Sequence, residues 1–504
     1  MSEISSKLAK GAVWIAAGRI VFVSIGFLNT IILARLLLPS DFGLVAIATT
    51  INTIIQSLTN MALSAALVQH DAPTREHYNT AFTLNVLRST VLGILIAVGG
   101  VLFSSLYQEP RLVGLFLAIG ASTIVMSFSN PKLVVMLRNL VFWQEFLIQS
   151  SNKLLTFIVA VTVAVIWKSY WALIVGIFAG QFLSLILGYV IVPYMPGFAV
   201  TKWRELISFS GWITLKDIVE NLNWRSDNLF VAYLLGNSAL GFYNVGQNLA
   251  TMPTREAISP IARTLFPAFS RIKNEKERLR RNYQKAQELI ASIAIPAGIG
   301  FALVADDLVR LALGEKWLGV IPVIQFIAGL AAIQTLGETL NPLAMAMGRT
   351  RLLFTRGLID FAIRLPLTIT GIFMDGIIGL LLARLVSGSA ALVIRMFLVR
   401  RLIGLTLAQQ IWRNWPTFLS TGIMCLVCVS VQRGISLWRS ENLVLETAAV
   451  ILLSGLTYIT SRLVIWHFRG KVEGPETLVM EYVSKLRGRF VPKSWEAICR
   501  GRNE

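Results

Sequence analysis

The chain has 504 residues, of which 55% are hydrophobic and only 14% are charged, and its formal net charge is +19. Soluble globular domains carry about 25% charged residues, so this composition excludes an ordinary soluble protein and predicts a polytopic membrane protein. The basic excess does not indicate nucleic acid as a partner, because most Lys and Arg fall in loops on one side of the predicted membrane.

Apolar stretches long enough to cross a bilayer follow one another along the whole chain. They are residues 12–34, 43–69, 79–106, 111–130, 144–166, 170–192, 206–235, 241–268, 285–310, 320–347, 352–373, 376–399, 412–432 and 442–466. The first stretch is too long for a signal-peptide core and is predicted to be an uncleaved span. We therefore expect an all-α membrane protein with about 14 transmembrane helices.

The loops between these spans fall into two sets with very different contents of Lys and Arg. The basic set holds Lys7, Lys10, Arg75, Lys132, Arg138, Lys202, Arg204, the run from Arg271 to Lys285, Arg349, Arg351, Arg400, Arg401, Arg413 and the tail. The other set holds Arg35, Arg111, Lys168, Arg310, Lys316, Arg433 and Arg439. The positive-inside rule places the basic set and both termini in the cytoplasm, which an even number of spans allows.

The chain contains an internal repeat at an offset of 198 residues. Without a gap, Trp14–Gly43 aligns with Trp212–Gly241, and nine of thirty positions are identical, including Trp14/Trp212, Ser40/Ser238 and Gly43/Gly241. The offset covers six spans, so the two copies have the same orientation, as in transporters built from parallel repeats. We predict six-helix lobes at 1–200 and 201–405, an extra helix pair at 406–466 and a basic tail at 467–504.

The tail combines eight Lys and Arg with an apolar face formed by Leu478, Val479, Tyr482 and Leu486. Such a segment can lie on the anionic inner leaflet, with membrane lipids as its partners. A solvated tail explains the same pattern equally well.

The segment Trp212 to Thr254 reads as two apolar helices joined by a turn, LLGNSALGFY, from Leu234 to Tyr243. Each helix carries a polar stripe: Lys216, Glu220, Asn223 and Asp227 on the first, and Asn244, Asn248, Thr251 and Arg255 on the second. A charged side chain in hydrocarbon costs roughly 2.5–3.5 kcal/mol, so we expect both stripes to face a wet interior. Polar contacts that only hold helices together are the alternative.

Basic residues, Arg364 among them, are predicted to form a cationic belt in the inner half of a central cavity. Five of these residues are predicted to bind a diphosphate. They are Arg19, Arg88, Lys153, Lys216 and Arg255. In the first lobe, Arg19, Arg88 and Lys153 have no deep acid beside them, and each lies roughly 10–15 Å below the cytoplasmic end of its span. Arg offers a planar fork to phosphate oxygens. Snorkelling of a long side chain to the interface is the competing explanation for any single residue.

Uncharged polar residues in the same region suit sugar hydroxyls. Gln56 and Asn60 share a stripe with Thr49 and Thr53, and Asn248 lies on the eighth span. Packing between helices through small polar groups explains them as well. Pro253, Pro260 and Pro267 in the eighth span and Pro342 in the tenth predict bends that could serve rocking between two states.

Acidic residues concentrate in the second lobe. Asp217, Glu220 and Asp227 are the candidates for coupling to H⁺ or Na⁺, although pairing with Lys216 or Arg225 accounts for them too. Asp360 and Arg364 are spaced i, i+4 and predict a structural ion pair.

No signature of an enzyme, cofactor site or metal site appears in the sequence. It has no GxxxxGK[ST], HExxH or GxSxG motif, and its only CxxC, Cys425 and Cys428, lies inside an apolar span. The three histidines all lie near membrane ends. We therefore expect neither a catalytic residue nor a bound cofactor or metal.

Three segments carry a family resemblance: LARLLLPSDFGLVA (Leu33 to Ala46), RSDNLFVAYLLGNSALGFYNVGQNLATMP (Arg225 to Pro253) and LFPAFSRI (Leu265 to Ile272). The chain resembles the polysaccharide transporters, or Wzx-like oligosaccharide flippases, of the multidrug/oligosaccharidyl-lipid/polysaccharide exporter superfamily. The motifs are structural, so no site residue is carried over from the family.

The resemblance implies a V-shaped pair of lobes that flips an undecaprenyl-diphosphate-linked oligosaccharide across the bacterial inner membrane, coupled to an ion gradient, for exopolysaccharide, capsule or O-antigen assembly. Lipid-linked oligosaccharide, H⁺ or Na⁺, membrane lipids and other polysaccharide assembly proteins are the expected partners. A multidrug exporter or a peptidoglycan-precursor flippase of the same superfamily is the alternative. A membrane glycan polymerase or ligase is disfavoured because no sizeable outer domain is present.

Overall fold

In a computed structural model, the protein is described over residues 3–59, 63, 66, 67, 70, 72–138, 142–207, 211–438, 443–470 and 474–477. The described part is built from helices and contains no strand. Nine of its helices are long and apolar enough to cross a membrane. The expected all-helical membrane protein is thereby confirmed. The number of fourteen spans stays a prediction, because two long helices each contain a break.

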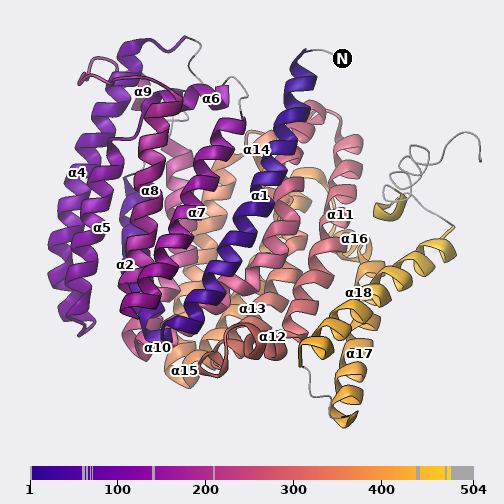
Figure 1. Ribbon diagram of the computed structural model, residues 1–504. Helices are drawn as coiled ribbons and strands as arrows, with labels where there is room; N and C mark the ends of the chain where they lie inside the picture. Colours follow the sequence, from indigo (N-terminus) through magenta and orange to yellow (C-terminus); the bar gives the residue numbers. More distant parts are fainter. Residues whose placement is uncertain are drawn as a thin grey trace, which may run out of the picture. The chain divides into compact units, whose positions relative to one another are not determined.

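The first half of the chain forms helices close to the predicted spans (Figure 1). They are α1 (Glu3–Leu36), α2 (Pro39–Leu58), α4 (Arg75–Leu106), α5 (Arg111–Ser127), η1 (Pro131–Leu133), α6 (Val134–Arg138), α7 (Phe142–Trp167), α8 (Trp171–Ile191) and α9 (Trp203–Ile207). The short helix α9 lies in the connection between the two predicted lobes, ahead of α10.

The second half contains the two broken helices. Its elements are α10 (Gly211–Ile272), α11 (Lys276–Leu303), α12 (Ala305–Ala312), η2 (Glu315–Trp317), α13 (Val320–Gln334), η3 (Thr335–Gly337), α14 (Leu340–Ala346), α15 (Thr350–Ile403), α16 (Leu407–Trp412), α17 (Trp415–Trp438) and α18 (Leu443–Phe468). Helix α10 breaks at Gly236, with φ 84° and ψ 177°, and α15 breaks at Asp375 and Gly376. The turn expected over Leu234 to Tyr243 is therefore confined to one residue, because glycine adopts this positive φ without strain.

The chain divides into two compact units. The first comprises residues 1–247, 309–323 and 350–387, and the second comprises 248–308, 324–349 and 388–504. These units are groups of closely packed residues. The predicted lobes at 1–200 and 201–405, the helix pair and the tail remain predictions.

Small residues let neighbouring helices approach closely in the first unit. Helices α4 and α5 lie side by side, and so do α7 and α8 (Figure 1). A Cβ on Gly93 of α4 would lie 2.6 Å from the Gly120 carbonyl oxygen, and one on Gly180 of α8 would lie 2.6 Å from that of Asn152. Within a bilayer such contacts replace the hydrophobic drive that holds soluble helices together.

The two copies of the sequence repeat touch each other in a reciprocal way. A Cβ added to Gly43 would lie 1.8 Å from the carbonyl oxygen of Asn237, and one added to Gly241 would lie 1.9 Å from that of Pro39. Pro39 and Gly43 correspond to Asn237 and Gly241 at the offset of 198. The beginning of α2 and the α10 segment after its break therefore pack backbone against backbone about a local twofold.

Helix ends near this contact are capped from across the same unit. Lys316 Nζ donates to the carbonyl oxygens of Arg35 at 2.6 Å and Leu37 at 2.9 Å, while Arg35 donates to that of Ala312 at 2.8 Å. Trp317 Nε1 donates to the Ala34 oxygen at 2.7 Å, and its ring is fully buried. The bonds from Lys316 and Trp317 satisfy carbonyl groups at the end of α1, and the bond from Arg35 satisfies one at the end of α12.

Buried charges join helices in the second unit. Glu288 of α11 accepts from Arg413 at 2.8 Å and lies 3.7 Å from Arg462 of α18, which also pairs with Glu476. The predicted apolar face of the tail, which starts at residue 478, lies outside the described residues.

Candidate functional site

A cavity of about 510 Å³ lies between α2, α4 and α10 in the first unit. It is lined by Thr53, Gln56, Ser57, Arg88, Asp217, Glu220 and Asn221. The sequence predicted four of these residues as site residues, and their side chains come from three helices separated by up to about 160 positions in the chain. The volume falls in the range usual for binding sites of small molecules.

A second cavity of about 230 Å³ shares Gln56 and Arg88 with the first and extends between α2, α4, α5 and α8. Its lining is rich in amides and hydroxyls: Thr49, Asn52, Asn85, Ser89, Ser122, Thr123, Ser127 and Gln181. Several of these groups bond to each other, as Ser122 does to Gln181 at 2.9 Å. The Oδ1 atom of Asn52 is buried and has no hydrogen-bond partner among the described residues.

Arg88 stands where the two cavities meet. Its Nη1 donates to the carbonyl oxygen of Thr59 at 3.2 Å, and its Nη2 lies 3.5 Å from Gln56 Oε1. Gln56 Nε2 in turn donates to Thr123 Oγ1 at 3.3 Å. Arg88 has no carboxylate partner within ion-pair distance among the described residues, and its Nε is buried without an acceptor. A guanidinium held in this way retains donors for an anionic ligand.

The opposite wall of the larger cavity is acidic. Lys216 Nζ donates to Glu220 Oε2 at 2.7 Å and to Asp217 Oδ1 at 3.1 Å, so the three residues form one charged cluster on α10. Asp217 and Glu220 therefore line the same cavity as Arg88, although neither lies within ion-pair distance of it. The expectation of no deep acid beside Arg88 considered the first lobe alone, whereas the beginning of α10 closes the same cavity. Lys216 serves the acids here, and it is not among the lining residues.

The other predicted binding residues lie elsewhere. Arg19 and Lys153 line neither of the two cavities, and Lys153 is exposed. Arg255 is exposed and lies 3.5 Å from Glu256 in the second unit, to which Asn248 also belongs. Asn60 lies outside the described residues. Of the predicted basic residues, Arg88 alone lines the larger cavity. Lys216 lies near that cavity because it pairs with Asp217 and Glu220, which line it.

Asp227 forms a separate buried cluster further along α10. Its Oδ2 accepts from Arg364 at 2.5 Å, from Arg384 at 2.6 Å and from the Tyr243 hydroxyl at 2.9 Å. Asp227 is 1% exposed, and its Oδ1 has no partner among the described residues. One carboxylate thus balances two buried guanidinium groups, which leaves the cluster with an excess positive charge.

The polar stripe of α10 serves two purposes along its length. Glu220 lines the cavity, whereas Asn223 Nδ2 donates to the Gly357 carbonyl at 2.9 Å, and Asp227 is enclosed by α15. Arg364 binds Asp227 where the sequence predicted a pair with Asp360, and Asp360 lies 3.5 Å from Arg356. Spacing along one helix favours i, i+4 partners, but a buried carboxylate on a neighbouring helix lies closer to Arg364.

Sequence reasoning missed Arg384 and Tyr243. Arg384 is 6% exposed in the middle of an apolar span, and an ionisable residue there is itself a signal of function or of a buried partner. Tyr243 gave no such signal, because an aromatic residue beside a turn is ordinary.

The arrangement can bind and release charged and hydroxylated groups. Arg88 provides donors for phosphate oxygens, the amides and hydroxyls of the smaller cavity suit a sugar, and the acids of α10 can hold a cation. The lining of the two cavities contains no cysteine or histidine that could act as a nucleophile or base.

Comparison with known proteins shows to which family the chain belongs. The family model described as "Polysaccharide biosynthesis protein" matches residues 32–322, more than half of the chain. The lipopolysaccharide biosynthesis protein WzxC of Escherichia coli K12 is 27% identical over 428 residues, which cover 83% of this chain and 86% of that protein. The succinoglycan biosynthesis transport protein ExoT of Rhizobium meliloti is 22% identical over 66% of this chain and 68% of its own length.

Solved structures agree on the fold. The lipid II flippase MurJ in an inward closed conformation matches with a TM-score of 0.74 and 14% identity, over 91% of this chain and 99% of that one. At this identity the match is evidence of the fold alone. The chain therefore belongs to the polysaccharide biosynthesis protein family of membrane proteins and has the helical fold shared with MurJ.

Proposed function

We propose that the protein translocates an undecaprenyl-diphosphate-linked oligosaccharide across the bacterial inner membrane, for exopolysaccharide, capsule or O-antigen assembly. The observation that carries the proposal is the position of Arg88 at the junction of two polar cavities, in a family named for polysaccharide biosynthesis. The names of the relatives WzxC and ExoT support the class of cargo.

The chemistry of the two cavities matches the two parts of such a cargo. The diphosphate needs a donor that stays charged, and Arg keeps its charge in surroundings that would deprotonate Lys. The sugars need amides and hydroxyls, which line the smaller cavity beside Arg88. The lipid tail needs no site in the protein, because it can stay in the bilayer during transfer.

In this proposal, the acidic residues of α10 bind the coupling ion. Asp217 and Glu220 share the larger cavity with Arg88, so an ion at the carboxylates and a cargo at Arg88 compete for the same space. Export driven by an inward gradient requires exchange, in which the ion moves inward as the cargo moves outward. The carboxylates would bind H⁺ or Na⁺ from outside after the cargo has left, and they would release it to the cytoplasm before the next cargo binds. Asp227 is the third coupling candidate.

The test of the binding site uses the double variant Arg19→Ala with Arg88→Ala in a strain whose surface glycan depends on this protein. We expect surface glycan to be lost while membrane insertion stays normal. The Arg88→Ala single variant should account for most of the loss, because only Arg88 lines the cavities, and Lys153→Ala is the matched control. Normal surface glycan in the double variant would contradict the proposal.

The test of coupling measures export after collapse of the proton or sodium gradient. Glu220→Gln and Asp227→Asn, compared at equal amounts of folded protein in the membrane, are expected to weaken the dependence of export on that gradient. Unchanged dependence in both variants would exclude a coupling role for these carboxylates.

A fluorescent lipid II added to reconstituted vesicles tests the peptidoglycan-precursor alternative. Rapid lipid II transfer would favour that cargo over an oligosaccharide.

A further inference from the structure

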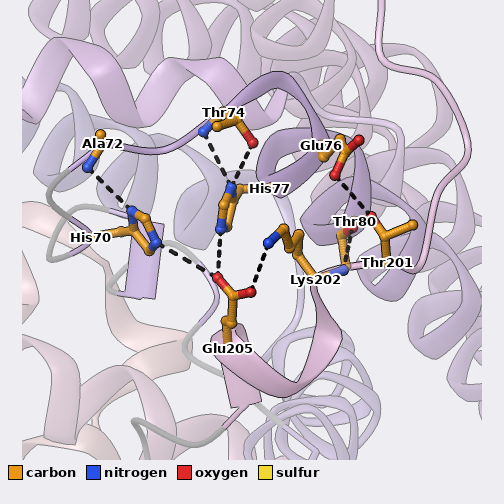
Figure 2. A network of polar contacts seen from close by, with 9 residues as sticks. All are labelled: His70, Ala72, Thr74, Glu76, His77, Thr80, Thr201, Lys202 and Glu205. Atoms are coloured by element: carbon orange, nitrogen blue, oxygen red, sulfur yellow. Dashed lines mark hydrogen bonds and ion pairs between the residues drawn. The ribbon is translucent and has the colours of Figure 1, made fainter.

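Three potential metal ligands meet at one end of the first unit, away from both cavities. Nε2 of His77 lies 2.9 Å from Glu205 Oε2, and Nε2 of His70 lies 3.8 Å from the same oxygen (Figure 2). The ligand atoms of the three residues all lie within 4.8 Å of one another. His70 precedes α4, His77 lies in its first turn, and Glu205 is on α9.

The connection that carries Glu205 is held along α4 by a row of side chains. Asn79 Oδ1 accepts the Gly197 N–H at 3.0 Å, Thr83 Oγ1 accepts that of Ala199 at 2.9 Å, and Thr80 Oγ1 accepts that of Lys202 at 3.3 Å. Thr201 and Glu76 make a further contact at 3.4 Å (Figure 2). This docking fixes the position of Glu205 opposite the histidines independently of any ion.

We propose that His70, His77 and Glu205 form a binding site for a divalent transition-metal ion of the Zn²⁺ class. Imidazole nitrogen and carboxylate oxygen are the ligands that such ions accept, and three protein ligands leave a fourth position for water. Tetrahedral ligands about 2.0–2.2 Å from zinc lie roughly 3.3–3.5 Å apart. The two observed distances to Glu205, 2.9 and 3.8 Å, bracket that separation, and the nitrogens of the two histidines lie within 4.8 Å of each other, so the rings must move closer together around an ion.

The surroundings of the Glu205 carboxylate favour its binding to a metal ion. Lys202 Nζ donates to Oε1 of Glu205 at 2.8 Å, which leaves Oε2 for an ion (Figure 2). The hydrogen bond from Lys202, followed by that from His77, lowers the pKa of Glu205 to about 2, so the group is ionised at neutral pH. The Glu205 side chain is 47% exposed and that of His70 is 34% exposed, which opens a path for the ion from solvent.

The hydrogen bonds of the imidazole rings are compatible with metal binding. In the metal-free state both Nδ1 atoms face backbone N–H groups, of Thr74 and of Ala72, each at 3.2 Å, so the ring protons sit on Nε2. Binding at Nε2 shifts each proton to Nδ1. His77 can then donate to Thr74 Oγ1, 2.8 Å away, which is the outer-shell bond that usually orients such a ligand. The N–H groups of Thr74 and Ala72, which are both exposed residues, then bond to water in place of the imidazole nitrogens.

No sequence pattern indicated this site, because six residues separate His70 from His77 and Glu205 follows His77 by 128 positions. An ion there would fasten α9, and with it the chain segment between the two predicted lobes, to the start of α4.

The experiment uses the purified full chain in detergent, with the affinity tag removed and metal stripped by a chelator. Titration of Zn²⁺ against a fluorescent chelator is expected to reveal one tight equivalent. Co²⁺ should give the visible absorption of a tetrahedral nitrogen and oxygen site. His77→Asn keeps an acceptor for the Thr74 N–H but removes Nε2, and it should weaken zinc affinity at least about tenfold, as should His70→Asn and Glu205→Gln.

The controls are Glu76→Gln, a neighbouring carboxylate in the same network, and His467→Asn, the histidine on α18. Both should bind zinc like the unaltered protein. Absence of a tight equivalent, or unchanged affinity in the three ligand variants, would overturn the proposal. Should His77→Asn fail to fold, the two variants at exposed side chains still decide the question. The readout is binding alone, so its outcome is independent of transport.

Discussion

At the scale of single residues, buried charge is the most consequential feature of the molecule. Arg88 is held by a backbone carbonyl and an amide and keeps free donors, whereas Arg364 and Arg384 both pair with Asp227. The same residue type is thus proposed to bind cargo in one place, and it pairs with a buried carboxylate in the other. The difference lies in whether a carboxylate is within reach.

Replacement of Asp227 by Asn should be strongly destabilising. It would leave two buried guanidinium groups without a counter-charge, a change that typically costs about 3–5 kcal/mol. Tyr243→Phe removes one hydroxyl donor from the same oxygen and should cost only about 1 kcal/mol. Thermal unfolding of the purified proteins measures both. Equal midpoints for the two variants would show that Asp227 carries no net charge in this cluster.

At the scale of elements, close backbone contacts and caps hold several helices together. Gly43 and Gly241 allow the two copies of the repeat to meet without side chains between them. Charged side chains then cap the exposed helix ends, as Lys316 does for α1.

Gly43→Ala should disturb the contact between α2 and α10. The new methyl group would lie 1.8 Å from the Asn237 oxygen, and relief of such overlap costs about 1–3 kcal/mol. Gly26→Ala is the control, because nothing lies within 4 Å of its Cβ position. That change should be neutral or stabilising by up to about 1 kcal/mol. A lowered unfolding temperature is expected for Gly43→Ala only, and the reverse order would refute the close approach.

The stability of the fold is expected to depend on pH through Glu109, which lies between α4 and α5. Glu109 accepts two hydrogen bonds from Arg111 and one from Asn237 of α10 at 2.7 Å. The bond from Arg111, opposed in part by burial, holds the pKa of Glu109 below its ordinary value. Because the folded pKa is lowered, the stabilisation is complete above the unfolded pKa of about 4.3 and disappears as the pH falls through the folded value.

The prediction for Glu109 is tested by the unfolding temperature of Glu109→Gln against pH. This variant should lose less stability than the unaltered protein when the pH is lowered from 5 to below 4. Glu315→Gln, at a carboxylate whose side chain is 73% exposed, should leave the pH profile unchanged. Identical profiles for all three proteins would contradict the assigned role.

At the scale of the whole molecule, charge asymmetry predicts the orientation in the membrane. The basic loops and the tail are expected on the cytoplasmic side, which places the predicted zinc site and the entry of cargo there as well.

The cysteines of the chain provide a test of this orientation. Cys425 and Cys428 lie in the apolar helix α17, and Cys499 lies in the basic tail. In a variant that retains only Cys499, a membrane-impermeant maleimide should label inverted vesicles and leave intact cells unlabelled. Labelling of intact cells would place the C-terminus outside and reverse the predicted topology.

The sequence by itself determined the class of the protein, the approximate course of its helices and its family. Hydrophobic length is a local property, and motifs such as the one around Gly236 are contiguous, so both can be read along the chain. The repeat was also visible, and the reciprocal packing of Gly43 and Gly241 agrees with it.

Only the tertiary structure decided which polar residues meet. The acids of α10 close the cavity beside Arg88, Arg364 prefers Asp227, and Glu205 faces two histidines more than a hundred residues away. Helical periodicity assigns a side chain to a face of its own helix but leaves open which neighbour covers that face. A buried charged side chain pairs with the opposite charge that lies closest to it in space. The packing of the helices determines which charge that is.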